Sequence, residues 1–260
     1  MRKDSIGYDA DQYKRTKLLP FRVHVEDYTI FDLLGDIKGQ RGFDVGCGTG
    51  LYARKMIKLG ASHVTGLDLD ARMIALARKR SREFGDSITY VKENIEDSIG
   101  KEDCDFALGS YVLSYSRTLE EAAEYFRRIF THLKPGGRFI GFGNNPFDAF
   151  FGSRYKEYGI EKIMEGDVEG SPVIYRIHDN DVGGKLVATA TNYHLHAATY
   201  REASREAGIR QFSLEPVQLD PNPVKIHPIT GRILPDEYYD NFFGGLPRFK
   251  SPFIAMVAVK

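Results

Sequence analysis

A glycine-rich loop and a nearby carboxylate are the residues of this chain whose types and spacing best suit a ligand site. The loop begins at Asp44 and carries Gly46, Gly48 and Gly50, and Asp68 follows Gly48 by twenty residues. Glycines at a strand-to-helix turn let the backbone approach a ligand closely, and a carboxylate ending the next strand can accept hydrogen bonds from both hydroxyls of a ribose. The spacing predicts a site for a nucleoside-containing ligand. The alternative for the loop is a tight turn without a ligand.

The residues around Asp68 decide how that carboxylate is interpreted. Asp70 is the better N-cap for the following helix, which leaves Asp68 available to a ligand. Asn94 comes after the next strand, and because parallel strands end at one sheet edge, its side chain should lie near the same ligand. The alternative for Asn94 is an ordinary turn after the strand.

The elements that must position these residues alternate between β-rich runs and helical patterns. The β-rich runs are residues 42–45, 63–67, 88–91, 104–108 and 138–142. The helical patterns are residues 51–59 and 73–84, each followed by a glycine, and residues 119–133, which begin after a capping box of Thr118 and Glu121. This alternation is typical of βαβ units, so we expect an α/β fold with a mostly parallel sheet.

Residues beyond 143 follow a different pattern. Residues 173–178 and 186–195 flank Gly183 and Gly184 and predict an antiparallel pair of strands. We therefore expect residues 148–196 to form an inserted α/β lid. A helix over residues 199–207 and strands over residues 211–217 and 253–259 would complete the fold.

Composition limits the classes of partner. Thirty-six basic residues balance thirty-six acidic ones, so no overall positive field attracts nucleic acid or an anionic membrane. The apolar runs are too short to cross a bilayer, which takes about 20 residues. Cys47 and Cys104 are too few for a disulfide framework or a cysteine zinc site, and the basic start leads into no apolar signal core. We expect a cytoplasmic protein with a small-molecule partner, and the sequence leaves its oligomeric state open.

Four stretches of the chain resemble the class I S-adenosylmethionine-dependent methyltransferases. They are the glycine loop at residues 44–50, the ribose motif at 66–68, the adenine-side turn at 93–95 and the turn at 133–137. A nicotinamide dehydrogenase is the alternative for the loop, but its Gly-X-Gly-X-X-Gly fingerprint would place the third glycine three residues after Gly48, and Gly50 follows after two. The resemblance implies a single methyltransferase domain over residues 1–260. Its Rossmann-like sheet would be doubly wound, seven-stranded and mostly parallel, with an antiparallel last strand.

The resemblance also implies which residues bind S-adenosylmethionine or its product, S-adenosylhomocysteine. Asp68 would accept hydrogen bonds from the ribose diol, Leu69 would pack near the adenine, and Gly46 would approach the amino-acid end. Cys47 would fill space in the loop, because no nearby Cys-X-X-Cys or evident base supports a redox or nucleophilic role. The full expected set is Tyr13, Asp44, Gly46, Cys47, Gly48, Asp68, Leu69, Asn94, Ile95 and Ser110.

Flanking stretches resemble a narrower group, the toxoflavin-type small-molecule N-methyltransferases. They are residues 8–9, 19–22, 34–36, 109–115, 155–160 and 200–208. This resemblance implies a small heterocyclic acceptor, and we expect methylation at a ring or amine nitrogen beneath the lid. Aromatic faces suit a cationic sulfonium and a flat acceptor, so Tyr111 and Tyr115, after the fourth strand, are expected beside the acceptor, with Asn145 in a turn after the fifth strand. Ordinary packing is the alternative for the two tyrosines, and strand termination is the alternative for Ser110. Residues 1–23 would fold over the bound donor, the alternative being a helix packed permanently on the core.

No catalytic residue is assigned from the sequence. In-line methyl transfer needs the acceptor lone pair about 3 Å from the methyl carbon, and holding that geometry can supply about 7 to 11 kcal/mol. A ring nitrogen already carries its lone pair, whereas a hydroxyl acceptor would need a general base. A non-catalytic S-adenosylmethionine-binding protein is the alternative from another functional class.

Two other patterns resemble sites of a different kind, although Asn145 in the first of them is expected in a turn that faces the acceptor pocket. Residues 144–147 are similar to the Asn-Pro-Pro-Tyr motif of enzymes that methylate amino groups in DNA, RNA or protein, but that motif follows the fourth strand and this segment follows the fifth. His194 and His196 alternate onto one strand face, as metal ligands would, yet no carboxylate stands at a fixed spacing from them. We therefore expect no metal.

Overall fold

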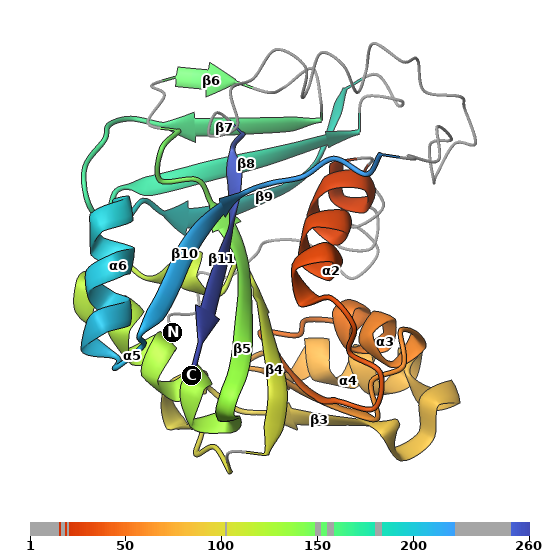
Figure 1. Cartoon of the computed structure of the whole chain (residues 1–260). Helices are drawn as coiled ribbons and strands as arrows, with labels where there is room; N and C mark the ends of the chain where they lie inside the picture. The colour runs from red at the N-terminus through yellow and green to blue at the C-terminus, as the bar shows by residue number, and fades with distance from the viewer. Residues whose placement is uncertain are drawn as a thin grey trace.

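A seven-stranded sheet forms the centre of the computed structural model, which describes residues 16, 19, 21–101, 103–148, 152–154, 159–179, 184–221 and 251–260. The strand order is β10-β11-β5-β4-β1-β2-β3 (Figure 1). The strands are β1 (Arg41–Val45), β2 (His63–Asp68), β3 (Ile88–Lys92), β4 (Cys104–Ser110), β5 (Leu133–Asn144), β10 (Gln211–Pro216) and β11 (Phe253–Val259). β11 is antiparallel to both of its neighbours, and the remaining pairs are parallel. The predicted mostly parallel α/β sheet with an antiparallel last strand is confirmed.

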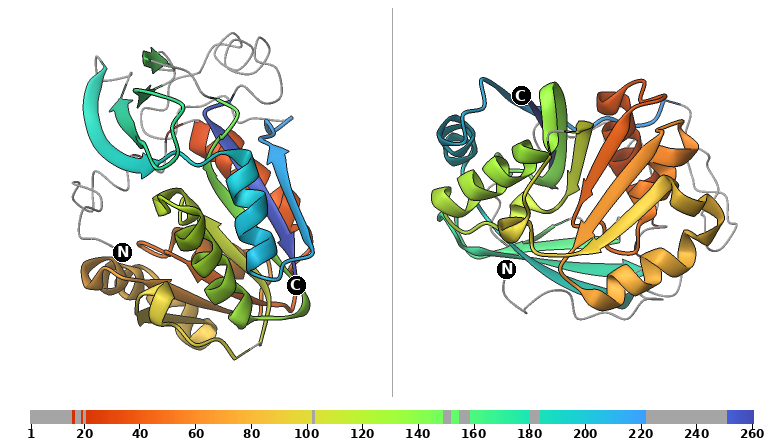
Figure 2. Two further views of the ribbon diagram at one scale, coloured as in Figure 1. Left: turned by 90° about the vertical axis from the view of Figure 1, so that its left-hand side faces the viewer. Right: turned by 90° about the horizontal axis from the view of Figure 1, so that it is seen from below.

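Helices cover both faces of this sheet (Figures 1 and 2). One face carries the π-helix η1 (Arg22–Asp27), α2 (Tyr28–Leu34), α3 (Leu51–Lys58) and α4 (Ala71–Arg80), and the other carries α5 (Leu119–His132) and α6 (Ala197–Glu206). Short 3-10 helices are η2 (Arg82–Ser87), η3 (Ile95–Asp97) and η4 (Leu113–Tyr115). Within the described part of the chain, no helix combines the length and apolar character that a membrane span requires.

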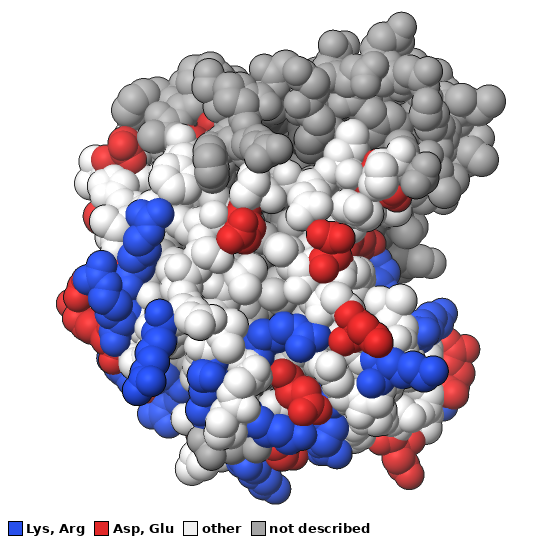
Figure 3. Space-filling model, viewed as in Figure 1, with Lys and Arg blue, Asp and Glu red and all other residues white. Residues whose placement is uncertain are grey.

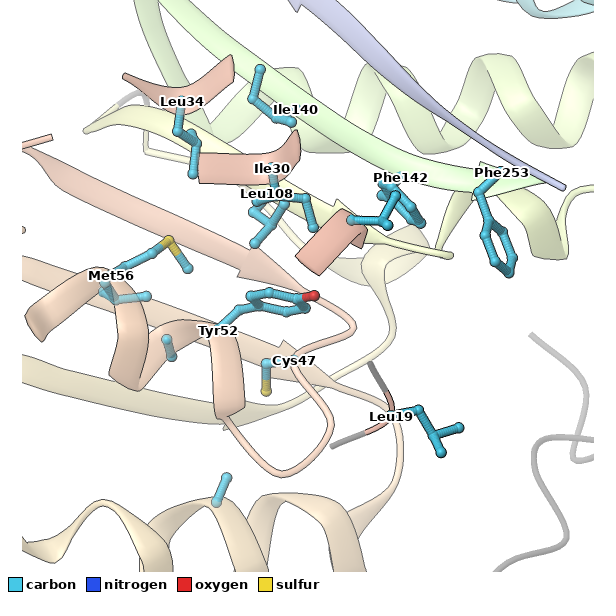
Figure 4. Packing of buried hydrophobic residues seen from close by; sticks show 14 of the residues in the cluster. Leu19, Ile30, Leu34, Cys47, Tyr52, Met56, Leu108, Ile140, Phe142 and Phe253 are labelled. Atoms are coloured by element: carbon cyan, nitrogen blue, oxygen red, sulfur yellow. The ribbon is translucent and has the colours of Figure 1, made fainter. Parts of the chain in front are cut away.

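Alternating side chains of the sheet reach the two helical layers. On β4, Phe106 and Leu108 pack in the cluster that contains Ile30 of α2 and Met56 of α3, whereas Ala107 packs in the cluster that contains residues of α5 and α6. Successive residues of a strand point to opposite faces, so the apolar run from Phe106 to Leu108 in β4 is buried on both sides. Figure 4 shows Ile30, Leu34, Met56, Leu108 and Ile140 within the first layer.

Local signals in the sequence set where these helices begin and end. The Thr118 hydroxyl accepts a hydrogen bond of 3.3 Å from the backbone N–H of Glu121, and the Glu121 carboxylate accepts one of 2.8 Å from the backbone N–H of Arg117. The capping interaction thus forms with its carboxylate reaching one residue further back than in the usual box. Gly60 follows α3 with a φ of 98°, a conformation that favours glycine.

A second sheet, the lid sheet, is inserted between β5 and α6. It is antiparallel, with the order β6 (Gly152–Arg154), β7 (Ile160–Met164), β8 (Pro172–Asp179) and β9 (Lys185–Tyr193). It lies across one end of the main sheet in Figure 1. The sequence predicts an α/β insertion, but the described residues of 148–196 contain strands without a helix. Burial alternates along β8, where Val173, Tyr175 and Ile177 are buried, so its period is that of a strand.

The two ends of the insertion lie side by side. The side-chain amide of Asn144, the last residue of β5, donates a hydrogen bond of 3.0 Å to the backbone carbonyl of Tyr193, the last residue of β9. The guanidinium carbon of Arg117 lies 4.1 Å from the centre of the Tyr193 ring. These contacts hold the base of the lid sheet to the end of β5 and to the segment before α5.

Candidate functional site

One cavity lies between the carboxyl end of the main sheet and the lid sheet. Its volume is about 780 Å³, within the range of about 300 to 1,000 Å³ that small-molecule pockets have. Part of its wall comes from the ends of the main-sheet strands: Gly46, Gly48, Asp68, Leu69, Asn94, Ile95 and Ser110. Another part comes from the lid sheet: Ile160, Tyr175, Ile177, Ala190 and Asn192. Most of the expected donor residues therefore share one space with the lid.

The glycine loop connects β1 to α3 at the cavity wall. Gly46, Gly48 and Gly50 have φ angles of 65°, 53° and 70°, in the left-handed region that favours glycine. A Cβ atom at Gly46 would lie 2.7 Å from a methyl carbon of Val112, and one at Gly50 would lie 2.1 Å from the Tyr90 hydroxyl. Conformation and space both require glycine at these two positions.

Asp68 stands at the end of β2, next to the loop. Its carboxylate accepts hydrogen bonds of 2.8 Å from the backbone N–H groups of Gly48 and Asp70, one on each oxygen. Burial raises the pKa of the Asp68 carboxyl above its ordinary 3.8, while the two N–H groups act in the opposite direction. Asp70 caps α4, because its own carboxylate accepts a hydrogen bond of 2.8 Å from the N–H of Arg72. Asp70 therefore caps the helix, as predicted, and Asp68 lines the cavity.

Asn94 and Ile95 follow β3 and begin η3. The Asn94 side chain caps this short helix, and its amide donates a hydrogen bond of 2.8 Å to the Glu96 carboxylate. The turn that was the alternative for Asn94 is therefore present, and Asn94 also lines the cavity. Capping and a contact with a ligand are compatible at this position.

Three of the expected residues that the structure describes do not line the cavity. The Asp44 carboxylate lies behind the loop and accepts a hydrogen bond of 3.0 Å from the N–H of Ala53. Cys47 is buried, and this burial raises the pKa of its thiol well above the ordinary value, in keeping with a space-filling residue. Asn145 is buried and its amide donates a hydrogen bond of 2.6 Å to the carbonyl of Ser251. Tyr13 lies outside the described residues.

Tyr111 follows β4 in an unusual backbone conformation. Among the described residues it is the one non-glycine residue with a positive φ, 66°. Such conformations persist where surrounding contacts hold them, and they are frequent at functional sites. Tyr111 lines the cavity with Ser110 and Tyr115, so the structure brings together three of the residues singled out after β4.

A buried carboxylate, Glu26 of η1, holds this segment in place and was not anticipated from the sequence. Its oxygens accept hydrogen bonds from Tyr111 and Ser110, both at 3.0 Å, and from the Tyr52 hydroxyl at 2.7 Å. Glu26 also forms an ion pair with Arg22, one turn earlier in η1. A buried charge is tolerated when it is paired and hydrogen-bonded, as here. Its hydrogen-bonding partners come from α3, from the end of β4 and from the residue after β4, so no local pattern could have revealed the cluster.

Aromatic rings form one side of the cavity around Phe253, the first residue of β11. The Phe253 ring stacks on Tyr175 with 5.4 Å between centres and on Phe21 with 5.8 Å. The Tyr111 ring meets it edge-on at 5.7 Å. All four residues line the cavity, and Figure 4 shows Phe253 beside Phe142 at the end of the sheet. Flat apolar walls of this kind suit a flat ligand.

Comparison with known proteins agrees with this geometry. Residues 43–137 match the family described as "Methyltransferase domain". The chain is 31% identical over 138 residues to the ubiquinone biosynthesis O-methyltransferase of Vibrio parahaemolyticus, a match that covers 51% of this chain and 55% of that protein. It is 34% identical over 120 residues to phosphoethanolamine N-methyltransferase 2 of Caenorhabditis elegans, covering 44% and 26% respectively. The chain thus spans about half, or less, of the length of these curated relatives.

The whole fold also has solved counterparts. The S-adenosylmethionine-dependent methyltransferase from Mesorhizobium loti superposes with a TM-score of 0.55 at 22% identity, over 88% of this chain and 94% of that one. At this level of identity the likeness concerns the fold. Residues 43–137 are therefore similar to a methyltransferase domain, and the chain shares the fold of solved S-adenosylmethionine-dependent methyltransferases.

Proposed function

We propose that this protein transfers the methyl group of S-adenosylmethionine to a small, flat acceptor, at a ring or amine nitrogen. The observation that carries the proposal is the single cavity shared by the sheet-edge residues and the lid sheet. A donor and an acceptor bound in one cavity can be held in line, and positioning alone can account for much of the rate.

The residues present fit the donor at the sheet edge. When bound, S-adenosylmethionine supplies an electrophilic methyl group on a cationic sulfonium. We assign Asp68 to the ribose diol, because a carboxylate has about four acceptor positions and the two backbone N–H groups use two of them. Gly46 and Gly48 keep the loop backbone open to the amino-acid end, and Asn94 and Ile95 are assigned to the adenine side.

The acceptor half is mainly aromatic and apolar, and the Arg22 guanidinium adds a positive charge beside the Phe21 and Tyr111 rings. Phe21, Tyr111, Tyr175 and Phe253 supply rings, and Ile160, Ile177 and Ala190 supply aliphatic surface. Asn192 adds a polar group within the lid, where it can orient a ring substituent. A small heteroaromatic molecule matches this wall better than a peptide or a sugar.

A nitrogen acceptor agrees with the groups around this half of the cavity. Burial raises the pKa of Tyr111 well above its ordinary value, so its hydroxyl stays protonated and cannot accept a proton. Among the described wall residues, the carboxylates are Asp68, Asp70 and Glu93, all at the donor end, and no histidine is present. An acceptor that brings its own lone pair needs no base, which favours a ring or amine nitrogen over a hydroxyl.

The surface charge suits a small-molecule partner. Basic and acidic side chains are interspersed over the described residues on the face shown in Figure 3, and the whole chain carries equal numbers of each. Nucleic-acid binding draws on a basic patch or stripe, so a mixed surface favours a small acceptor.

The proposal is tested in two steps with purified protein. Calorimetry with S-adenosylhomocysteine should give saturable binding, and mass spectrometry of retained ligands should detect the donor or its product. Release of S-adenosylhomocysteine is then measured with a panel of heteroaromatic amines and ring-matched phenols. Methylation of the amines supports the proposal, methylation of the phenols alone overturns the choice of nitrogen, and binding without turnover on any acceptor leaves a non-catalytic donor-binding protein. Absence of binding rejects the donor site itself.

A further inference from the structure

Two histidines and an aspartate meet at the base of the lid sheet, away from the cavity. His194 and His196 follow β9, and Asp167 belongs to the turn between β7 and β8. The Nε2 atoms of His194 and His196 lie 2.7 and 3.0 Å from the same Asp167 oxygen, Oδ1. One potential ligand atom from each residue lies within 4.8 Å of the other two. The aspartate stands 27 residues before His194, which explains why the sequence offered no carboxylate at a fixed spacing.

A second carboxylate orients one of these imidazoles. Nδ1 of His196 lies 2.9 Å from Oε1 of Glu169, and the same oxygen accepts a hydrogen bond of 2.9 Å from the backbone N–H of His196. A neutral imidazole carries its proton on one nitrogen only. With that proton on Nδ1 facing Glu169, Nε2 presents a lone pair to the Asp167 carboxylate. Two electron-rich atoms at 3.0 Å need a cation between them, either a proton or a metal ion.

The backbone holds the cluster in one arrangement. The N–H of His194 donates to the carbonyl of Ser171, and the N–H of Gly170 donates to the carbonyl of His194, both at 2.8 Å. These two bonds fix the β7–β8 turn against the segment that bears the histidines. The His194 side chain is almost completely buried, whereas those of His196 and Asp167 are 41% and 45% exposed, so the cluster is open to solvent on one side.

We propose that Asp167, His194 and His196 bind a divalent first-row transition metal. Glu169 orients the His196 ring through its Nδ1 atom. Two imidazoles and a carboxylate are ligands that Zn²⁺ prefers, and three protein ligands with a solvent-accessible fourth position form a common zinc arrangement. The carboxylate partner on the far ring nitrogen is the usual support for a metal-binding histidine. Zinc–ligand bonds of about 2.0 to 2.2 Å require the ligand atoms to spread slightly, and Asp167 lies in an exposed turn that can move outward.

The position of this site defines its role. None of its three ligands lines the cavity, so the metal does not take part in the transfer reaction. It joins the β7–β8 turn to the N-terminal end of α6, where His196 is the capping residue. The metal therefore fixes the base of the lid sheet to the main body of the protein.

Zinc binding is measured on untagged full-length protein after treatment with a chelator. Calorimetry with Zn²⁺ should give one site per chain, and Co²⁺ should produce the visible absorption of a nitrogen- and oxygen-ligated ion. Asp167→Asn and His196→Asn should each abolish saturable binding, and Glu169→Gln should weaken it by about 10- to 100-fold. Asp167→Asn alters an exposed side chain, so loss of the fold would not explain its effect; circular dichroism verifies this.

Two controls keep the result specific. His63→Asn removes a histidine from β2, outside the cluster, and should bind Zn²⁺ as the unaltered protein does. Zinc should raise the melting temperature of the unaltered protein and of His63→Asn, and should leave that of Asp167→Asn unchanged. The proposal is overturned if the unaltered protein takes up no zinc, which leaves a proton-bridged ion pair, or if Asp167→Asn and His196→Asn bind zinc as tightly as it does.

Discussion

The Tyr111 hydroxyl donates a hydrogen bond of 3.0 Å to the buried carboxylate of Glu26, which ties the residue after β4 to the first described helix. A hydrogen bond to a charged group contributes about 1.5 to 3 kcal/mol. We expect Tyr111→Phe to lower the free energy of unfolding by about this amount, measured by urea denaturation. Tyr28→Phe on α2 is the matched control. Equal stability of the two variants would show that the bond to Glu26 contributes little.

Asp68 is expected to govern donor affinity. Asp68→Asn keeps the shape of the side chain but loses the charge, so two hydrogen bonds worth about 1.5 to 3 kcal/mol each become neutral ones worth about 0.5 to 1.5 kcal/mol. Calorimetry with S-adenosylhomocysteine should therefore show a dissociation constant at least about tenfold higher, which corresponds to 1.4 kcal/mol. The control is Asp103→Asn. Asp103 stands just before β4, at the end of that strand away from the cavity, so this variant should bind like the unaltered protein. An unchanged constant in Asp68→Asn would remove this residue from the donor site.

The raised pKa of Asp68 predicts opposite pH effects on binding and on the stability of the free protein. Protonation removes the charge that strengthens these hydrogen bonds and turns one acceptor oxygen into a donor, so affinity for S-adenosylhomocysteine should fall as pH decreases through the folded pKa, which lies above 3.8. For the free protein the sign is reversed: a carboxyl with a raised folded pKa stabilises the fold below its unfolded pKa, and that contribution is lost as pH rises through the folded value.

Comparison with Asp68→Asn isolates both effects. The difference in melting temperature between the unaltered protein and the variant should shift in favour of the unaltered protein as pH falls, while the difference in affinity between them shrinks. Parallel pH profiles for the two proteins would contradict the raised pKa.

The lid sheet is expected to select the acceptor. Ala190 of β9 lines the cavity, and Ala190→Phe would fill space on the acceptor side. We expect kcat/KM for the acceptor to fall by about tenfold or more, which is 1.4 kcal/mol, while affinity for S-adenosylhomocysteine stays the same. Thr189→Phe on the exposed face of the same strand is the control. Loss of donor affinity in Ala190→Phe alone would place this wall at the donor end instead.

The N-terminal segment is expected to close over the donor. Phe21 and Arg22, at the end of this segment, line the cavity, and Leu19 is buried. Hydrogen exchange in this segment should slow when S-adenosylhomocysteine binds, because ligand contacts favour the closed population. Deleting residues 1–15 should abolish turnover and leave the melting temperature of the free protein almost unchanged. Full activity of the shortened protein would show that the segment does not close the site.

Local sequence patterns predicted the parts of the site that are built locally. Gly46, Gly48 and Asp68 reach the cavity because strand ends in a βαβ sheet meet at one edge, and the cap formed by Asp70 is set by the residues directly after it. Glu26 and Phe253 escaped prediction, because each gains its role from partners distant in the sequence. The same reason hid Asp167, whose two histidine partners stand 27 and 29 residues later.

The hydrogen bond between Asn144 and Tyr193 joins the first and last residues that flank the insertion. The chain therefore leaves the main body of the protein and returns to it at one place. Loop-closure entropy grows slowly with length, so segments of different size and sequence could be exchanged between these two residues at modest cost. Recombination at this junction would give hybrid proteins that keep the sheet-edge wall of the cavity and receive a new lid-sheet wall. The junction is thus a natural point for evolution, or for protein engineering, to alter one wall of the cavity independently of the other.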